Sequence, residues 1–322
     1  MPGYDAFLLV SFGGPEGPGD VLPFLENVTR GRNVPRARLE AVAEHYLAFG
    51  GVSPINEQCR ELIAALDLPL PVYWGNRNWT PYLTDTVREM TAAGVRRALA
   101  FVTSAYRSYS SCRQYLEDIE RARAAVGQDA PVIDKIQRFY DHPGFIGPFA
   151  DSILAALATV PEDAHVVFTA HSIPLTMAEL AGPGGGSYVA ELTRACRLIT
   201  EQTELSEQTG VHRPWSLAYT SRSGPPAQPW LEPDINDHLA DLAKQGVRAV
   251  VVAPIGFVSD HMEVRHDLDL EAAQTAQSLG LAFARAATPG VRLAPMIGQL
   301  VREHLSGDAP TACPAHCCLE RA

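Results

Sequence analysis

Short apolar runs rich in β-branched residues alternate with segments of helical periodicity along the whole chain. This alternation is typical of βαβ units, in which crossover helices join the strands of a parallel sheet. The sequence therefore predicts an α/β fold with its strands in two groups of four. The expected strands are residues 6–12, 70–74, 98–103, 131–137, 164–170, 215–220, 248–254 and 281–285.

The length of the chain allows each group of strands to build its own core. At about 150 residues per domain, the 322 residues suggest roughly two domains. A stretch containing proline and glycine, residues 141–148, separates the two groups and is the expected hinge. We expect a first domain at residues 1–145, a second at residues 146–306, and a cysteine-bearing tail at residues 307–322.

Charge and apolar pattern exclude several classes of function. With 26 basic against 37 acidic side chains, the chain is a poor candidate for binding nucleic acid. Its longest apolar stretches, such as residues 249–258, reach about half of the roughly 20 residues that a membrane span needs. The N-terminal residues lack the basic segment of a secretory signal. We expect a cytoplasmic protein without stable membrane association.

A glycine-rich turn, FGGPEGPG at residues 12–19, follows the first expected strand. It matches neither the dinucleotide pattern G-x-G-x-x-G nor a phosphate loop ending in G-K-[ST]. Glu16 would also place a negative charge where a phosphate needs N–H donors. We expect no nucleotide here and interpret the turn as structural or substrate-lining.

One histidine stands where a parallel sheet collects ligands. His171 ends an expected buried strand, and ligands of open α/β sheets lie outside such carboxyl ends. A neutral imidazole there can act as a base or a metal ligand near pH 7, while a structural histidine is an equal alternative.

A row of carboxylates follows another strand of the same group. Glu263, Asp267 and Glu271 fall at i, i+4 and i+8 of an expected helix, which Ser259 or Asp260 would cap. Hard carboxylate oxygens on one face suit a divalent cation or proton transfer, and a solvated acidic face is the alternative. Since both features follow strands of one group, we expect them to open onto one crevice.

A basic cluster stands out in this acidic chain: Arg30, Arg32, Arg36 and Arg38. It lies at the start of an expected amphipathic helix that ends before Gly50 and Gly51. Guanidinium groups at this place could receive ligand carboxylates bidentately, although such arginines are usually only surface residues.

Six motifs in order along the chain carry a family resemblance. They are VSFGGP at 10–15, FGGVSPIN at 49–56, YWGN at 73–76, TAHSIP at 169–174, YTSRSGP at 219–225 with PWLEP at 229–233, and PIGFVSDHMEV at 254–264. Over nearly its whole length the chain resembles the ferrochelatases. The resemblance implies two similar Rossmann-like domains that hold a porphyrin between them, and metal insertion without ATP or nicotinamide.

The resemblance also implies roles for the residues singled out above. His171 corresponds to the histidine that takes the pyrrole protons or meets the incoming iron, and Glu263 to its acidic partner across the macrocycle. Asp267 and Glu271 fall where the family has an acidic ladder leading from solvent to the site. All four are expected to handle the metal.

The chain departs from the family pattern in the turn after the first strand. Many firmicute members carry a tyrosine there, close to the metal, whereas this chain has Phe12. Axial coordination by that residue is lost, and Tyr46 is a candidate replacement. Phe12, Trp74 and Phe257 are expected to form apolar walls around the macrocycle.

The expected substrates are ferrous iron and coproporphyrin III. The region between Gly31 and Ala48 is arginine-rich and lacks a long apolar patch, which favours a water-exposed mouth and a polar substrate. Resemblance to actinobacterial members favours coproporphyrin III, with four propionates, over protoporphyrin IX, with two. The expected substrate contacts are Phe12, Arg30, Tyr46, Ser53 and Tyr115. A transient contact with a downstream enzyme that uses coproheme is also consistent with the resemblance.

The resemblance further implies a [2Fe–2S] cluster. Such a cluster takes four ligands, and the tail offers Cys313, Cys317 and Cys318. Cys112 lies where cluster-bearing ferrochelatases place their upstream cysteine. Because Cys317 and Cys318 are adjacent, both can be ligands only if the backbone turns sharply. A zinc site with His316, a disulfide and an uncommitted tail are the alternatives.

Two other functions remain open from the sequence. One is a chelatase that inserts cobalt or nickel into a sirohydrochlorin-type tetrapyrrole. The other is a porphyrin carrier without enzymatic activity, which would need the walls of the cleft but would have no use for His171 and Glu263.

Overall fold

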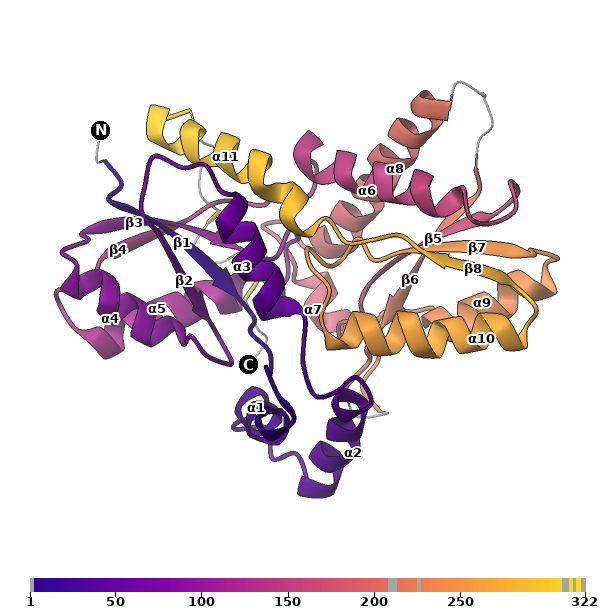
Figure 1. Ribbon diagram of the computed structural model, residues 1–322, viewed down its shortest axis with the longest axis horizontal. Helices are drawn as coiled ribbons and strands as arrows, with labels where there is room; N and C mark the ends of the chain where they lie inside the picture. The colour runs from indigo at the N-terminus through magenta and orange to yellow at the C-terminus, as the bar shows by residue number, and fades with distance from the viewer. Residues whose placement is uncertain (1–2, 208–212, 225–226, 309–312, 315–316, 320–322) are drawn as a thin grey trace.

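The computed structural model describes residues 3–207, 213–224, 227–308, 313–314 and 317–319. Within these residues, eight strands form two four-stranded sheets, one on each side of Figure 1. Every strand pair is parallel, and the ends of all eight strands lie within two residues of the expected positions. The predicted α/β fold with two parallel sheets is confirmed.

The first sheet has the strand order β2-β1-β3-β4. Its strands are β1 (Ala6–Ser11), β2 (Val72–Asn76), β3 (Arg97–Val102) and β4 (Val132–Lys135). Strand β1 is buried along its full length, because helices cover both faces of a parallel sheet. The helices of this half are α3 (Ile55–Ala65), α4 (Leu83–Ala92) and α5 (Gln114–Val126), the last preceded by a π-helical segment, η2 (Tyr109–Arg113).

The second sheet repeats the same order as β6-β5-β7-β8. Its strands are β5 (His165–His171), β6 (Trp215–Thr220), β7 (Ala249–Ala253) and β8 (Ala282–Arg285). The helices of this half are α7 (Leu175–Glu179), α8 (Ser187–Glu207), α9 (Ile235–Lys244), α10 (Ala273–Ser278) and α11 (Ala294–Ser306), with the π-helix η3 (Val264–Ala272) and the 3₁₀ turn η4 (Gly290–Leu293). None of the described helices is both long and apolar enough to cross a membrane.

Helix α6 (Pro143–Leu157) joins the two halves. The segment expected as a hinge, residues 141–148, forms the start of this helix instead of a loop. Phe145 and Phe149 are fully buried in a core that includes Phe101 of the first sheet and Phe168 of the second. The segment expected as a hinge is therefore largely helical, and its apolar side chains are packed in that common core.

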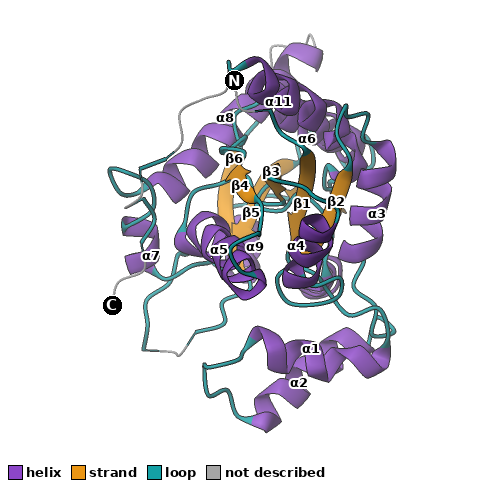
Figure 2. Cartoon of the chain, turned by 90° about the vertical axis from the view of Figure 1, so that its left-hand side faces the viewer, coloured by secondary structure: helices purple, strands orange, loops and turns teal. Residues whose placement is uncertain are grey.

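Two short helices, α1 (Val21–Val28) and α2 (Arg36–Leu47), form a lip below the sheets (Figures 1 and 2). The lip has a small core of its own, which includes Phe24 and Leu39. Helix α2 ends shortly before Gly50 and Gly51, as predicted.

The glycine-rich turn packs directly against neighbouring backbone and side chains. A Cβ atom on Gly14 would lie 2.6 Å from the Cβ of Ser53, and Gly13 has a φ of +81°. These two glycines therefore allow close approach of the turn to Ser53 and to β2.

Candidate active site

His171 projects from the carboxyl end of β5, a central strand of the second sheet. Its Nδ1 atom lies 2.5 Å from the carbonyl oxygen of Ser172, which fixes the N–H on that nitrogen. The Nε2 atom faces the Glu263 carboxylate at 3.7 Å. The structure therefore brings together the two side chains that the sequence singled out from different strands.

A second histidine, His261, lies beside this pair and was missed in the sequence. Burial lowers the pKa of its imidazole, while the Glu263 carboxylate acts in the opposite direction and His171 in the same direction. Its ring packs edge-on against Phe257, 4.7 Å between ring centres. The signal available was its position two residues before Glu263, in the segment already selected for its carboxylates.

The π-helix η3 carries the acidic row. The pKa of Asp267 is raised to about 6, mainly by burial and also by the nearby Glu263 carboxylate. A hydrogen bond from the Ser221 hydroxyl acts in the opposite direction. A carboxyl group that titrates near neutral pH is suited to carrying protons. Ser221 adopts a φ of +61°, a left-handed conformation uncommon outside glycine, at the point where it meets Asp267.

The predicted helix cap is wrong. Instead of capping the helix, the Asp260 carboxylate accepts a hydrogen bond from the Thr288 hydroxyl at 2.9 Å and forms an ion pair with Arg285 at 3.0 Å. Arg285 also binds Asp269 on η3. The carboxylate of Asp260 therefore ties the segment before η3 to β8.

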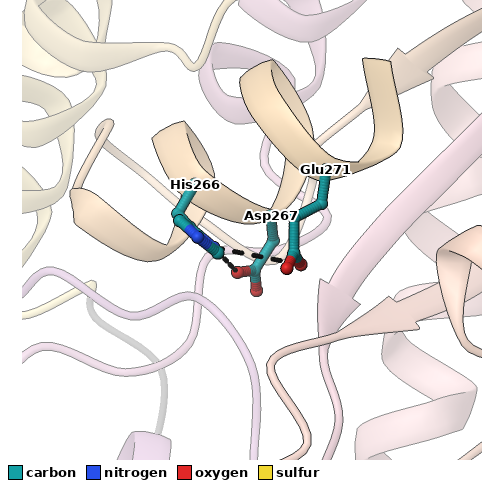
Figure 3. A group of neighbouring side chains, drawn as sticks. All are labelled: His266, Asp267 and Glu271. Carbon is teal, nitrogen blue, oxygen red and sulfur yellow. Dashed lines mark hydrogen bonds and ion pairs between the residues drawn. The ribbon is translucent and has the colours of Figure 1, made fainter. Parts of the chain in front are cut away.

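Near the outer end of the acidic row, three side chains converge as a candidate cation site: His266, Asp267 and Glu271 (Figure 3). One ligand atom of each lies within 4.8 Å of the others, and His266 Nδ1 is 3.3 Å from Asp267 and 3.9 Å from Glu271. The ring of His45 on the lip helix stacks on His266, with 3.9 Å between ring centres. Neither histidine was selected from the sequence, because their pairing depends on contact between the lip and η3.

A cavity of about 220 Å³ opens at this group, lined also by Ser221 and Asn236. It is smaller than the roughly 300–1,000 Å³ of ordinary small-molecule pockets. A hydrated metal ion suits this cavity better than a macrocycle does.

The lip contributes aromatic side chains next to the acidic row. Burial raises the pKa of the Tyr46 hydroxyl, and the charges of Glu263 and Asp267 raise it further. Phe12 packs against Phe24 of the lip, and the Arg77 guanidinium lies over the Phe12 ring.

The remaining expected substrate contacts lie in different environments. Arg30 is exposed on the lip, and Ser53 is buried against the glycine turn. Tyr115 is buried in the core of the first sheet beneath Arg77, 4.4 Å from the ring centre. A direct contact between Tyr115 and the substrate does not fit this buried position. Arg77, which was not selected from the sequence, lies between the rings of Tyr115 and Phe12.

The basic cluster is only partly available to a ligand. Arg36 is engaged by Glu26 and Glu40 at 2.5 and 2.9 Å. Trp74, expected as a wall, packs against the main core and donates a hydrogen bond to Asn76.

The four expected cluster ligands form one chain of sulfur contacts, which we call the four-cysteine site. The sulfurs of Cys317 and Cys318 are 3.4 Å apart, Cys318 contacts Cys112 on η2, and Cys317 contacts Cys313. A hydrogen bond from the Cys318 thiol, together with Lys135, lowers the pKa of Cys112 to about 6. Cys318 has a φ of +58°, which supplies the sharp turn that adjacent ligands need.

The donor set of this site fits a two-iron cluster better than a zinc ion. Tetrahedral zinc at about 2.3 Å from each sulfur requires its ligand sulfurs to lie about 3.8 Å from one another. Among the described residues, three or more ligand atoms that all lie within 4.8 Å of one another occur at His266, Asp267 and Glu271. The sulfurs of the described cysteines do not form such a group, so they are not gathered around one point as the ligands of a single zinc ion are. An extended thiol chain suits two irons, each of which takes two thiolates. His316 lies outside the described residues.

The fold is similar to that of solved metal chelatases. The structure is similar to SirB from Bacillus subtilis with Fe³⁺, with a TM-score of 0.56 and 13% identity over 94% of this chain and 96% of that one. A second structure, the sirohydrochlorin chelatase SirB in complex with cobalt, has a TM-score of 0.51 and 14% identity. At this identity the similarity concerns the fold alone.

The family follows from sequence comparison. The family model described as ferrochelatase matches residues 4–305. The chain is 55% identical to a coproporphyrin III ferrochelatase of Frankia alni, over 98% of this chain and 86% of that protein. It is 56% identical to the coproporphyrin III ferrochelatase of Nocardia farcinica and 49% identical to a ferrochelatase of Rhodopirellula baltica, over 95% and 99% of this chain and 90% and 94% of those proteins. The chain belongs to the ferrochelatase family.

Proposed function

We propose that this chain inserts ferrous iron into coproporphyrin III to form coproheme. The observation that carries the proposal is the Nε2 atom of His171, which faces Glu263 at 3.7 Å while Nδ1 donates to the carbonyl of Ser172. The names of the relatives from Frankia and Nocardia support the choice of coproporphyrin III.

The reaction removes two N–H protons from the porphyrin and puts one Fe²⁺ in their place. In the proposed mechanism, His171 Nε2 accepts a pyrrole proton, and the Glu263 carboxylate stabilises the imidazolium that forms. His261, whose pKa is lowered by burial, stays neutral and keeps positive charge low near the incoming metal. Asp267, with its pKa raised to about 6, accepts protons for transfer to solvent.

Iron enters from the outer end of the acidic row in this proposal. His266, Asp267 and Glu271 present one imidazole and two carboxylates, a mixed N and O donor set suited to Fe²⁺. Glu263 then lies between this group and His171. The iron is thus held as it loses water and before it meets the macrocycle.

The lip is proposed to bind the propionates. Arg30, Arg32 and Arg38 are exposed on it, so each can accept a carboxylate without breaking a buried contact. Each charge-assisted hydrogen bond contributes about 1.5–3 kcal/mol, so four propionates should bind better than two. Salt should weaken this preference.

The test is anaerobic incubation with ferrous iron and either coproporphyrin III or protoporphyrin IX, followed by absorbance. We expect faster insertion into coproporphyrin III. Equal or better turnover of protoporphyrin IX at low detergent would contradict the substrate assignment. Cobalt and nickel in place of iron test the alternative chelatase activity.

The same assay distinguishes an enzyme from a carrier. His171→Ala should lower the insertion rate about 10²–10⁴-fold, the usual cost of losing a general base. Porphyrin affinity should stay within a few fold. A variant that retains more than about half of the wild-type rate would show that His171 is not the base.

We also propose that Cys112, Cys313, Cys317 and Cys318 hold a [2Fe–2S] cluster. The support is the chain of four sulfurs and the turn at Cys318. When bound, such a cluster supplies a one-electron redox centre. Its ligands would tie the end of the chain to η2 of the first half.

Iron and acid-labile sulfide in purified protein test the cluster. Both should be present with visible iron–sulfur absorbance, and Cys112→Ser should remove it. Stoichiometric zinc without sulfide would contradict the cluster and favour the zinc alternative.

Finally, we propose that the two sheets define two domains, residues 1–145 and 146–306, followed by the tail. The repeated strand order supports this division. The boundary falls inside α6, so the domains would be joined by a helix packed in their common core.

A further inference from the structure

Arg107 lies between the four-cysteine site and the second sheet's half of the molecule. Its Nη2 atom is 3.7 Å from the sulfur of Cys313. Its Nη1 atom is 2.6 Å from one carboxylate oxygen of Glu191 on α8, and its backbone N–H donates to the other at 2.8 Å. The Arg107 guanidinium thus contacts both Cys313 of the tail and Glu191 of the second half.

Glu191 is a buried carboxylate with two cationic partners. Its side chain is 5% exposed, and Arg138 approaches it at 3.3 Å. Removing a partner from a buried charge is costly, because the charge that remains is unpaired. Arg107, Arg138 and Glu191, which we call the boundary ion group, therefore hold α8 against the segments that follow β3 and β4.

Arg107 has a third donor that the described residues do not use. Its Nε atom is buried and has no hydrogen-bond partner among them. Buried donors are nearly always satisfied, so an unused one on the guanidinium that contacts Cys313 points to an acceptor nearby. Thiolate or sulfide sulfur is such an acceptor.

A second contact joins the cysteines to the same half of the molecule. The backbone N–H of Gly182 donates to the Cys318 sulfur at 3.2 Å. Gly182 has a φ of +82°, and a Cβ there would lie 1.8 Å from the Ser187 hydroxyl oxygen. The backbone is thus held where only glycine fits, immediately before α8.

We propose that Arg107 couples the four-cysteine site to the boundary ion group, so that loading the site and holding α8 in place stabilise each other. The inference rests on the proposed loading of that site and is independent of iron insertion.

The coupling has a simple electrostatic origin. The four thiolates and the bridging sulfides of a two-iron cluster together carry more negative charge than its irons neutralise. Arg107 supplies a positive charge beside Cys313. The guanidinium is held in orientation by its bond to Glu191, and the backbone N–H of Arg107 donates to the other oxygen of the same carboxylate. By thermodynamic linkage, if the boundary ion group stabilises the loaded four-cysteine site, loading of that site must stabilise the boundary ion group by the same free energy.

The test compares Arg107→Met with Arg138→Met in the full-length protein. Both variants remove one cationic partner of Glu191, but only the first removes a sulfur contact. Hydrogen exchange of peptides from α8, measured before and after the protein is loaded with ferrous iron and sulfide, reports the coupling. Loading should increase the protection of α8 in the wild type and in Arg138→Met, Arg107→Met should lose that increase, and Arg107→Lys should restore part of it.

A second arm loads each protein with ferrous iron and sulfide under anaerobic conditions. Arg107→Met should bind the cluster about 10–100-fold more weakly, the usual cost of losing a group that contacts a metal ligand. It should also lose the rise in thermal midpoint that loading gives the wild type. Arg138→Met should keep both.

Equal effects of Arg107→Met and Arg138→Met on the protection of α8 would overturn the coupling and leave Arg107 a structural residue. Uptake of zinc but not of iron and sulfide would refute the cluster, while the same exchange comparison with zinc-loaded protein still decides the coupling. Loss of iron insertion alone would refute the proposed function without touching either arm.

Discussion

Glu263 and Glu271 stand at opposite ends of the acidic row, and their loss should have different kinetic effects. Glu263 faces His171, the proposed base, whereas Glu271 belongs to the outer candidate cation group. We expect Glu263→Gln to lower kcat about 10²-fold or more, because the imidazolium loses its counter-charge. Glu271→Gln should raise KM for Fe²⁺ with little change in kcat. Steady-state insertion at varied iron concentration measures both.

These two variants are each other's control, since both replace a carboxylate by an amide on the same segment. An equal fall in kcat for both would contradict the division into an inner catalytic end and an outer metal-holding end. Raised KM for iron in Glu263→Gln alone would reverse the assignment.

A second residue-scale prediction concerns acid stability. The Ser216 hydroxyl lies 2.9 Å from His165 and 2.6 Å from His238. Burial lowers the pKa of His165 to about 4 and also lowers that of His238. The unfolded chain therefore binds protons here more readily than the folded protein, so stability is lost as pH falls from about 6.5 toward 4.

The loss from His165 should be about 1–2 kcal/mol once solvent screening is allowed for. His165→Gln keeps a hydrogen-bonding group but cannot titrate, so its stability should depend less on pH. Urea unfolding at several pH values measures the difference. Identical pH dependence in variant and wild type would show that this pair does not titrate on unfolding.

At the scale of elements, the glycine turn after β1 should be intolerant of any side chain at one position. A Cβ on Gly14 would lie 2.6 Å from Ser53 and 2.8 Å from Ile55, so the turn or α3 must move. Gly14→Ala should cost about 1–3 kcal/mol by overpacking and should lower activity through displacement of Phe12.

Gly17→Ala is the matched control, because nothing lies within 4 Å of a Cβ at that position. Its thermal midpoint and insertion rate should match those of the wild type. Similar losses in the two variants would mean that turn flexibility, and not close packing, explains the glycines.

The strands and helices could be predicted from the sequence where the local pattern of apolar residues determines them. Buried strands such as β5 and β7 appear as continuous β-branched runs, and that pattern survives in the fold. The π-helix η3 was not predictable from the spacing of its carboxylates. It is held by Arg285, which binds Asp260 before the helix and Asp269 within it, and this contact comes from β8.

The candidate active site was likewise predictable only where local sequence pattern decides it. His171 and Glu263 could be selected because each follows a strand of one sheet. The stack of His45 on His266 and the bridge from Arg107 to Glu191 each join segments far apart in the chain. Periodicity and spacing carry no information about such contacts.

At the scale of the whole molecule, the two sheets share one core and should unfold together. Phe7 and Leu99 of the first sheet, Phe168 and Val251 of the second, and Phe149 of α6 belong to a single buried cluster. By contrast, the lip has a small core of its own. Each sheet also has a buried cluster of its own on its other face. Because the cluster shared through α6 joins the two halves, both sheets should be lost in one cooperative transition.

Phe149→Ala tests this, because it empties a fully buried position between the halves. It should cost about 3–5 kcal/mol and lower the urea midpoint for β1 and β7 equally, as measured by hydrogen exchange of peptides from each strand. Leu25→Ala, in the separate core of the lip, should increase exchange in α1 and α2 without shifting either midpoint. Loss of protection in one sheet at a lower urea concentration than in the other would show that α6 joins two independent domains, each stabilised by its own contacts.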